Sequence, residues 1–256
     1  THNLSISASN DRNRFSLGLG YAADEGIIRH EKLEKIMFSF NDEYKVTKAI
    51  KLGFNFNGVR QNSPYGYAEN VLNDARKAIP NAHAGTIDIY NKNPYGLDST
   101  MQTLYYELPG IQNSGVVNPL IRLENEWDKT IDISYRTVGS LFAEINLLKN
   151  FTWKSTVYAD FSNQNKREYK PVYYSYDPAI GKTFFTSSVS GVTENDNTAK
   201  KIQQDHILTY KKQFNAHGFN ASAGFTTYFN SFRSRTGTVQ QSVTGAPIPD
   251  DPRFWY

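Results

Sequence analysis

The sequence predicts an all-β protein built from four antiparallel hairpins, which together supply about eight strands. Apolar residues alternate with polar or small ones in paired segments, and a short polar turn joins the two members of each pair. The composition agrees with this prediction. Aromatic residues make up 14% of the 256 residues, and Gly and Asn recur beside them, which favours strands and turns over helices.

The first hairpin shows the alternation most clearly. Leu4, Ile6 and Ala8 lead into the turn "SNDRN", and the strand that returns is "RFSLGLGY". This strand has an apolar side and a small or polar side (Phe15, Leu17, Leu19 and Tyr21 against Ser16, Gly18 and Gly20). The other hairpins join residues 36–44 to 50–56 through "VTKA", 141–147 to 153–161 through "LKN", and 201–212 to 219–229 through "QFNAHG".

The connections between the hairpins are much longer than the turns within them. We expect loops at residues 22–34, 60–132 and 163–201, and a tail at 230–256 that forms no strand. Loops beyond about 15 residues are uncommon in compact soluble domains. An outer-membrane β-barrel, in contrast, has short periplasmic turns and long external loops. The alternation of short and long connections therefore favours a transmembrane barrel.

The two sides of the predicted strands support the same interpretation. The residues that alternate with the apolar ones are polar or small (Lys35, Ser39, Asn41 and Glu43; Lys51, Gly53, Asn55 and Asn57; Lys154, Thr156, Tyr158 and Asp160; Asn220, Ser222, Gly224 and Thr226). We expect the apolar side to face lipid and the polar side to face a wet lumen. Periodicity alone does not distinguish this from a soluble barrel. The long loops favour the membrane, as do Tyr21, Tyr44 and Trp153 at strand ends, where an interfacial girdle would lie.

The sequence gives no sign of catalytic, cofactor or metal chemistry. It has no cysteine, its five histidines are scattered, and it has no G-x-S-x-G motif. "GLGY" at 18–21 lacks the third glycine of a dinucleotide fingerprint. The segment 193–201 could hold Ca²⁺ through Asn195, Asp196 and Asn197, but it lacks the ligand order of an EF-hand. We therefore interpret it as a solvated loop. The net charge of +3 is too small to predict nucleic-acid binding.

The hairpin sequences resemble a known family. "HNLSISASNDRNRFSLGLGYAADEGII", "YKVTKAIKLGFNFNG" and "RTVGSLFAEINLLKNFTWKSTVYADFSN" are similar to barrel hairpins of the SusC/RagA family of TonB-dependent outer-membrane transporters. The resemblance covers all four hairpins, whereas the loops match little. It implies a 22-stranded barrel with a plug domain in its lumen. It also implies a location in the bacterial outer membrane, energy from TonB, a SusD-like lipoprotein lid, and import of oligosaccharides or peptides. It implies no enzyme activity and no cofactor.

The chain departs from that family in what it lacks. No segment resembles the plug or the part that contacts TonB, and eight strands cannot close so large a barrel. We therefore expect residues 1–256 to be part of one barrel domain, in contact with outer-membrane lipid, with TonB acting through a plug region outside the chain. An open, curved sheet should result, without hydrogen bonds between residues 2–8 and 218–229, because unpaired edges must be paired elsewhere in a membrane.

Residues 60–132 hold the candidate binding surface. Tyrosines recur there beside turn residues, and "AENVLNDARKAI" at 68–79 has helical spacing. Aromatic faces beside Asn, Asp and Arg suit sugar rings, and a peptide could use the same surface. Packing of the loop on itself is the alternative. The predicted contacts for substrate or lid are Tyr65, Tyr67, Tyr90, Tyr95, Tyr105 and Trp127.

Two other functions are compatible with parts of the pattern. A soluble or surface-anchored all-β carbohydrate-binding module could also carry long loops. A complete small eight-stranded outer-membrane barrel would need large side chains to fill its interior. The polar sides of these strands instead carry small residues (Gly18, Gly20, Ser39, Gly53, Ser222 and Gly224). We therefore favour the importer segment and keep the carbohydrate-binding module as the alternative.

Overall fold

One antiparallel sheet of eight strands dominates the computed structural model, which describes residues 1–64, 68–81, 85–94, 98–112 and 116–242. The strand order is β1-β2-β3-β4-β7-β8-β11-β12, so the eight strands lie in the sheet in the same order as in the sequence. Their bounds are β1 His2–Ser9, β2 Asn13–Glu25, β3 Lys32–Lys45, β4 Ile50–Asn62, β7 Thr130–Leu148, β8 Phe151–Lys170, β11 Val189–Phe214 and β12 His217–Ser242. The prediction of four hairpins and eight antiparallel strands is confirmed.

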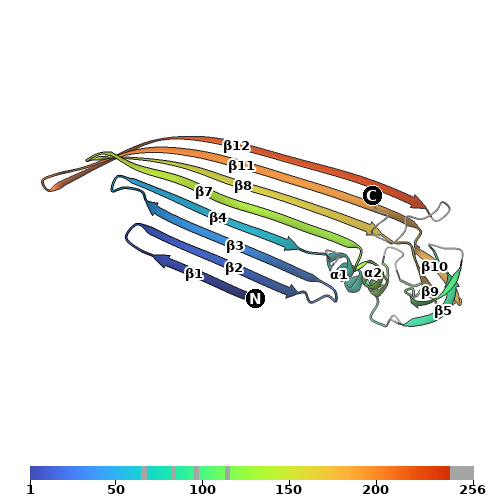
Figure 1. Cartoon of the computed structure of the whole chain (residues 1–256). Helices are drawn as coiled ribbons and strands as arrows, with labels where there is room; N and C mark the ends of the chain where they lie inside the picture. Colours follow the sequence, from blue (N-terminus) through green and yellow to red (C-terminus); the bar gives the residue numbers. More distant parts are fainter. Residues whose placement is uncertain (65–67, 82–84, 95–97, 113–115, 243–256) are drawn as a thin grey trace.

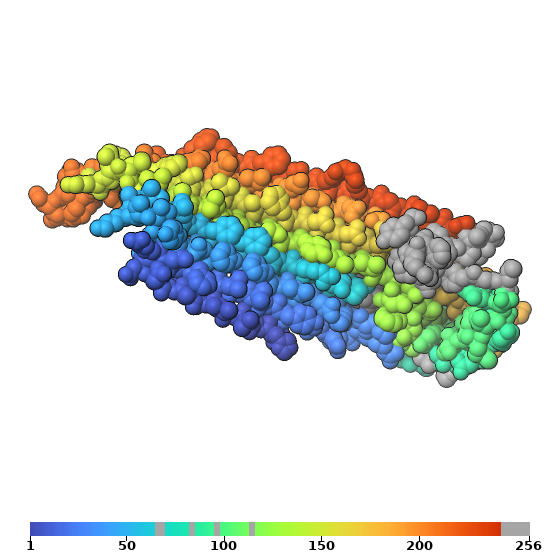
Figure 2. All heavy atoms as spheres, viewed as in Figure 1, coloured from blue at the N-terminus to red at the C-terminus, as the bar shows by residue number. Residues whose placement is uncertain are grey.

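Short turns lie at one end of the sheet and the long connections gather at the other (Figure 1). We call these the turn end and the loop end. The loop end holds two helices and two small hairpins: α1 Ala68–Lys77, α2 Pro119–Glu126, β5 Thr86–Lys92 with β6 Ser99–Tyr105, and β9 Tyr173–Asp177 with β10 Lys182–Ser187. In the space-filling view they form one mass beyond the ends of the strands (Figure 2). The helical spacing at 68–79 is confirmed by α1.

The sheet is open along both edges in the described part of the chain. β1 and β12 are the first and last strands of the order and lie at opposite edges (Figure 1). β1 pairs with β2 alone, through His2↔Tyr21 to Ser9↔Arg14. The expectation that residues 2–8 do not pair with 218–229 is therefore confirmed.

Pairing in register gives the sheet two chemically distinct faces. Directly opposite residues in an antiparallel ladder lie on the same face. Phe54, Leu141 and Val157 pair across three strands and form a row on one face. The residues next to them on the same strands, Asn55, Ser140 and Tyr158, form a row on the opposite face. We call the first the apolar face and the second the polar face.

The apolar side chains are not covered by the chain itself. They are substantially exposed, for example 53% for Ile6, 55% for Leu141 and 65% for Phe225. On the polar face, side chains form hydrogen bonds with one another, both across strands and along β4. Asn41 Nδ2 donates to Ser16 Oγ, Asn55 Nδ2 donates to Asn41 Oδ1, and Asn57 Nδ2 donates to Asn55 Oδ1. The sheet thus pairs some of its polar-face side chains with one another and leaves its apolar face bare.

A close approach on the polar face explains one of its glycines. A Cβ at Gly53 would collide with the ring of Phe142 on the neighbouring strand. That ring lies under two ammonium groups, with Lys51 Nζ 5.4 Å and Lys154 Nζ 4.7 Å from its centroid. Gly53 therefore lets an aromatic ring lie flat along the wall.

Several expected loops are shorter than predicted, because the strands continue beyond the apolar alternation. β2 and β3 leave only residues 26–31 between them, and β8 and β11 occupy most of 163–201. The interpretation of 193–201 as a loop is wrong, since Asn195, Asp196 and Asn197 lie on β11. The tail prediction is wrong up to Ser242, where β12 ends, and residues 243–256 lie outside the described residues. Polar side chains that pair across strands replace the alternation in these extensions.

Candidate functional site

The loop end has a small core of its own. Val71 of α1 and Leu123 of α2 are buried against each other, with Ile28 and Leu120 packed beside them. Arg122 Nη1 lies 3.4 Å from Asp74 Oδ2 and joins the same two helices at the edge of this core. The residues between β2 and β3 and those between β4 and β7 are therefore packed as one unit.

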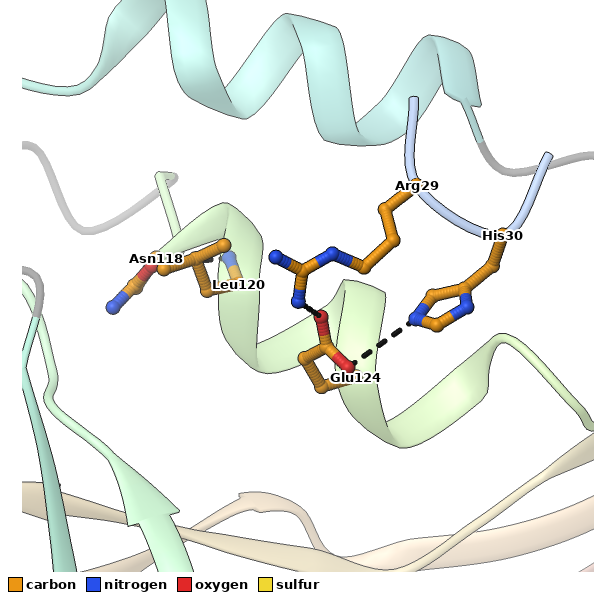
Figure 3. A network of polar contacts seen from close by, with 5 residues as sticks. All are labelled: Arg29, His30, Asn118, Leu120 and Glu124. Atoms are coloured by element: carbon orange, nitrogen blue, oxygen red, sulfur yellow. Dashed lines mark hydrogen bonds and ion pairs between the residues drawn. The ribbon is translucent and has the colours of Figure 1, made fainter. Parts of the chain in front are cut away.

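An asparagine fixes where α2 begins. Asn118 Oδ1 accepts a hydrogen bond from the backbone N–H of Leu120 at 3.0 Å, which caps the helix, and Pro119 occupies the first turn (Figure 3). The Asn118 amide also donates to the carbonyl of Tyr106 at 2.7 Å. Asn118 thus ties the start of α2 to the chain that leaves β6.

Glu124 is the centre of a polar cluster at the surface of α2. Its Oε1 accepts from Arg29 Nη1 at 2.7 Å, and its Oε2 lies 3.3 Å from His30 Nε2 (Figure 3). The His30 ring stacks on Trp127 with centroids 4.3 Å apart, and its backbone has φ of 71°. We call Arg29, His30, Glu124 and Trp127 the Glu124 cluster. It holds the loop between β2 and β3 against α2.

A second carboxylate of α2, that of Glu126, is partly buried. The Tyr173 hydroxyl donates to Glu126 Oε1 at 2.7 Å, which joins α2 to the start of β9. Burial raises the pKa of Glu126, and the hydrogen bond from Tyr173 offsets part of that rise. Burial and the neighbouring Glu126 also raise the pKa of the Tyr173 phenol. Tyr173 therefore acts as a neutral donor.

The hairpin of β9 and β10 is joined to the segment that follows β6. The hydroxyls of Ser175 and Thr186 both donate to Glu107 Oε1, and the Glu107 N–H donates to the carbonyl of Tyr176 at 2.8 Å. Tyr174 and Phe185 stack on the same hairpin with centroids 4.2 Å apart. Loops from three separate connections thus form one continuous surface.

Two of the six predicted contact residues, Trp127 and Tyr105, lie near Glu124. Trp127 is 40% exposed and belongs to the Glu124 cluster. Tyr105 is partly buried, and burial together with the negative charge of Glu124 raises the pKa of its phenol. Tyr90 is 69% exposed and lies on β5, an element that contributes no residue to the Glu124 cluster. Tyr65, Tyr67 and Tyr95 lie outside the described residues, as does the terminal 254–256.

Sequence reasoning missed the charged residues that organise this surface. Glu124 and Glu126 stand on a helix whose start is marked by Asn118 and Pro119, a recognisable signal for a capped N-terminus. Arg29 and His30 had no such signal, because their partner is about a hundred positions further along the chain and only the fold brings it near.

The polar face is hollowed below the loop end. A hollow of about 620 Å³ there is lined by polar and charged side chains (Lys35, Gln61, Ser134, Arg136, Gln164 and Asn197) and also by apolar ones (Met37, Val59, Ala199 and Phe232). Arg136 forms a forked pair with Asp160, with Nε–Oδ1 3.1 Å and Nη2–Oδ2 2.9 Å. Among the described residues, no group of three His, Asp or Glu side chains could hold a metal ion. The site offers hydrogen bonds, charges and aromatic faces, which suit binding.

None of the helices in the described residues is long and apolar enough to cross a membrane.

Comparison with known proteins adds a family context. No protein-family model matches the sequence. The chain is 22% identical over 234 residues to TonB-dependent receptor P3 of Formosa agariphila, which covers 87% of this chain and 21% of the receptor. The chain thus spans about a fifth of the length of the curated relative it matches. That relative confirms the resemblance to TonB-dependent receptors.

Solved structures agree on the fold. The RagAB peptide importer in its closed-closed state superposes with a TM-score of 0.67 and 14% identity, over 95% of this chain and 25% of that one. A structure of the RagAB peptide transporter gives 0.66 and 15%, and the open-open state gives 0.65 and 16%, each over 93% of this chain and 25% of the other. The long antiparallel sheet is therefore a known arrangement.

Proposed function

We propose that this chain forms part of the barrel wall of a TonB-dependent importer in the bacterial outer membrane. The observation that carries the proposal is the bare apolar face, which runs across all eight strands and is left exposed by every other part of the described chain. Apolar patches of such extent mark surfaces that contact membrane or protein. Here a lipid bilayer supplies the missing cover.

The height of the apolar face fits a bilayer. On β4, Arg60 stands at the loop-end limit of the apolar rows and Ile50 at the turn-end limit, ten residues away. Ten residues span about 33 Å along a strand, and a tilt of about 40° reduces this to about 25 Å, the usual height of the apolar band on such barrels. Tyr21 lies at the loop-end limit, and Tyr44 and Trp153 lie toward the turn end, as an interfacial girdle requires.

The polar face then lines the lumen, and the loop end faces outward from the cell. The side-chain amides of Asn41, Asn55 and Asn57 and the polar residues of the hollow beneath the loop end are suited to water and to polar solutes. The similarity to TonB-dependent receptors and to RagAB supports import driven through TonB, with an oligosaccharide or a peptide as substrate. A SusD-like lipoprotein would dock on the loop end, where Trp127, Tyr105 and Tyr90 present aromatic surface to it or to the substrate.

The proposal is tested on the full-length protein in its own bacterium. We expect the protein in the outer-membrane fraction, released by detergent and retained through washes with high salt and carbonate. Uptake of labelled oligosaccharides or peptides should cease when TonB is deleted. Release by salt alone would favour the alternative, a surface-anchored carbohydrate-binding module. Retention in the membrane with uptake that is independent of TonB would contradict the importer.

A further inference from the structure

Three cations gather on the apolar face where β11 and β12 leave the apolar rows. Lys200 pairs in register with Ser231, and the next positions on the same face of β12 are Arg233 and Arg235, opposite Thr198 and Asp196. Neighbours two apart on one strand, and diagonal neighbours on adjacent strands, lie about 7 to 8 Å apart. Arg233 is such a neighbour of both Lys200 and Arg235, so the three side chains form one continuous basic strip.

The position of these cations is at a chemical boundary. On the turn side, the adjacent row of the same face is apolar, with Ala159, Ile202 and Phe229 side by side. On the loop side, the face becomes polar, and Asn165 Nδ2 donates to Asp196 Oδ1 at 2.6 Å while Arg167 pairs with Glu194 at 2.9 Å. Lys200, Arg233 and Arg235 thus border the apolar band on its outer side.

Among the described residues, no carboxylate forms an ion pair with any of these three cations, although Asp196 is the register partner of Arg235. All three cations are exposed. The nearby carboxylates have other partners, Asn165 for Asp196 and Arg167 for Glu194. A basic patch with an apolar surface directly beneath it remains, and we call it the Arg233 patch.

We propose that the Arg233 patch binds the phosphate group of a lipid in the outer leaflet, an inference that rests on the proposed function. Arginine forks bind phosphate oxygens in pairs, and the Lys200 ammonium adds a point charge. The acyl chains of the same lipid would lie along Phe229 and Phe161, which face the same way. On the proposed function a lid protein would dock on the loop end, which leaves this side surface to lipid.

The test compares two double variants of the full-length protein in neutral detergent, with phosphatidic acid as the probe. Arg233→Gln with Arg235→Gln removes two charges from the patch. Lys51→Gln with Lys154→Gln removes two charges from the polar face and is the matched control. A cation at an anionic membrane surface contributes about a factor of five, so loss of two should weaken binding roughly thirtyfold. Native mass spectrometry of the retained lipid measures this.

The outcomes separate the inference from the function on which it rests. Wild type and the control should retain phosphatidic acid but not phosphatidylcholine, and inorganic phosphate should displace little of it. Equal retention by both double variants overturns the patch while leaving the importer intact. Displacement by inorganic phosphate at low concentration shows a free-anion site and also overturns the lipid. Failure of the wild type to enter membranes would overturn the proposed function and the patch together.

Discussion

The sheet and the loop end are stabilised in different ways. Buried hydrophobic side chains of the described chain lie at the loop end, in the connections and where β8 reaches them (Val71, Leu104, Ile121, Leu123, Tyr169, Val172 and Tyr173). The sheet has long backbone ladders and paired polar side chains, but its apolar residues remain exposed. The loop end is folded like a small soluble domain. The sheet is complete only when another medium covers it.

The largest expected effect comes from removing most of the loop end while keeping the sheet. Replacing residues 64–129 with a short Gly-Ser linker removes α1, α2 and the hairpin of β5 and β6. The sheet should still assemble, because Asn62 pairs with Ile133 and the ends of β4 and β7 already meet. Capture of substrate or docking of the lid should fall to a small fraction of the wild-type level, since external loops carry function on a scaffold they do not support. Assembly is read from heat-modifiable migration on gels, and loss of assembly as well would show that the loop is structural.

A cavity in the loop-end core should lower the stability of the loop end and leave that of the sheet unchanged. Ile121 is fully buried, so Ile121→Ala should destabilise the loop end by about 2 to 5 kcal/mol. Hydrogen exchange should accelerate in α1 and α2 and stay unchanged in β3 and β4. Leu72→Ala, at a side chain 37% exposed on α1, is the matched control and should have a much smaller effect. Faster exchange throughout the sheet would contradict the independence of the two regions.

Charge substitutions on neighbouring positions of β4 distinguish the two faces of the sheet. Phe54→Arg places a charge on the apolar face and should destabilise the protein by roughly 2 to 4 kcal/mol in lipid, whereas Asn55→Arg on the polar face should cost little. Urea titration of the full-length protein in vesicles measures both. Equal costs at the two positions would contradict the assignment of the faces.

Much of the sheet could be predicted from the sequence, because register and face follow from alternation. The hairpin at Leu4 to Tyr21 and the one at Ile36 to Phe56 match the structure closely. The ends of the strands could not be predicted. After Asn163 on β8 and before Thr198 on β11, both sides of these strands carry mainly polar residues, so the alternation is lost although the backbone ladder continues.

The candidate site was less accessible to sequence reasoning. Aromatic residues such as Trp127 could be selected by type and by their place in a long loop. The Glu124 cluster could not, because it joins Arg29 and His30 to a helix far along the chain. Contacts between loops depend on where the strands place those loops in space. The local sequence pattern does not specify that placement.

The smallest expected effect is a pH dependence confined to the loop end. Burial raises the pKa of Glu126 above its ordinary value of 4.5, so folding favours the protonated carboxyl. Its contribution to stability is therefore complete below the unfolded pKa and declines as the pH rises through the raised, folded-state pKa. Hydrogen exchange of the α2 amides in the full-length protein, followed against urea concentration, reports the unfolding of the loop end. Its midpoint should fall as the pH rises across this window, and Glu126→Gln should flatten the profile because its amide does not titrate and can still accept from Tyr173. An unchanged slope in that variant would assign the dependence to another group, and a parallel shift in the unfolding of the sheet would show that the two regions are coupled.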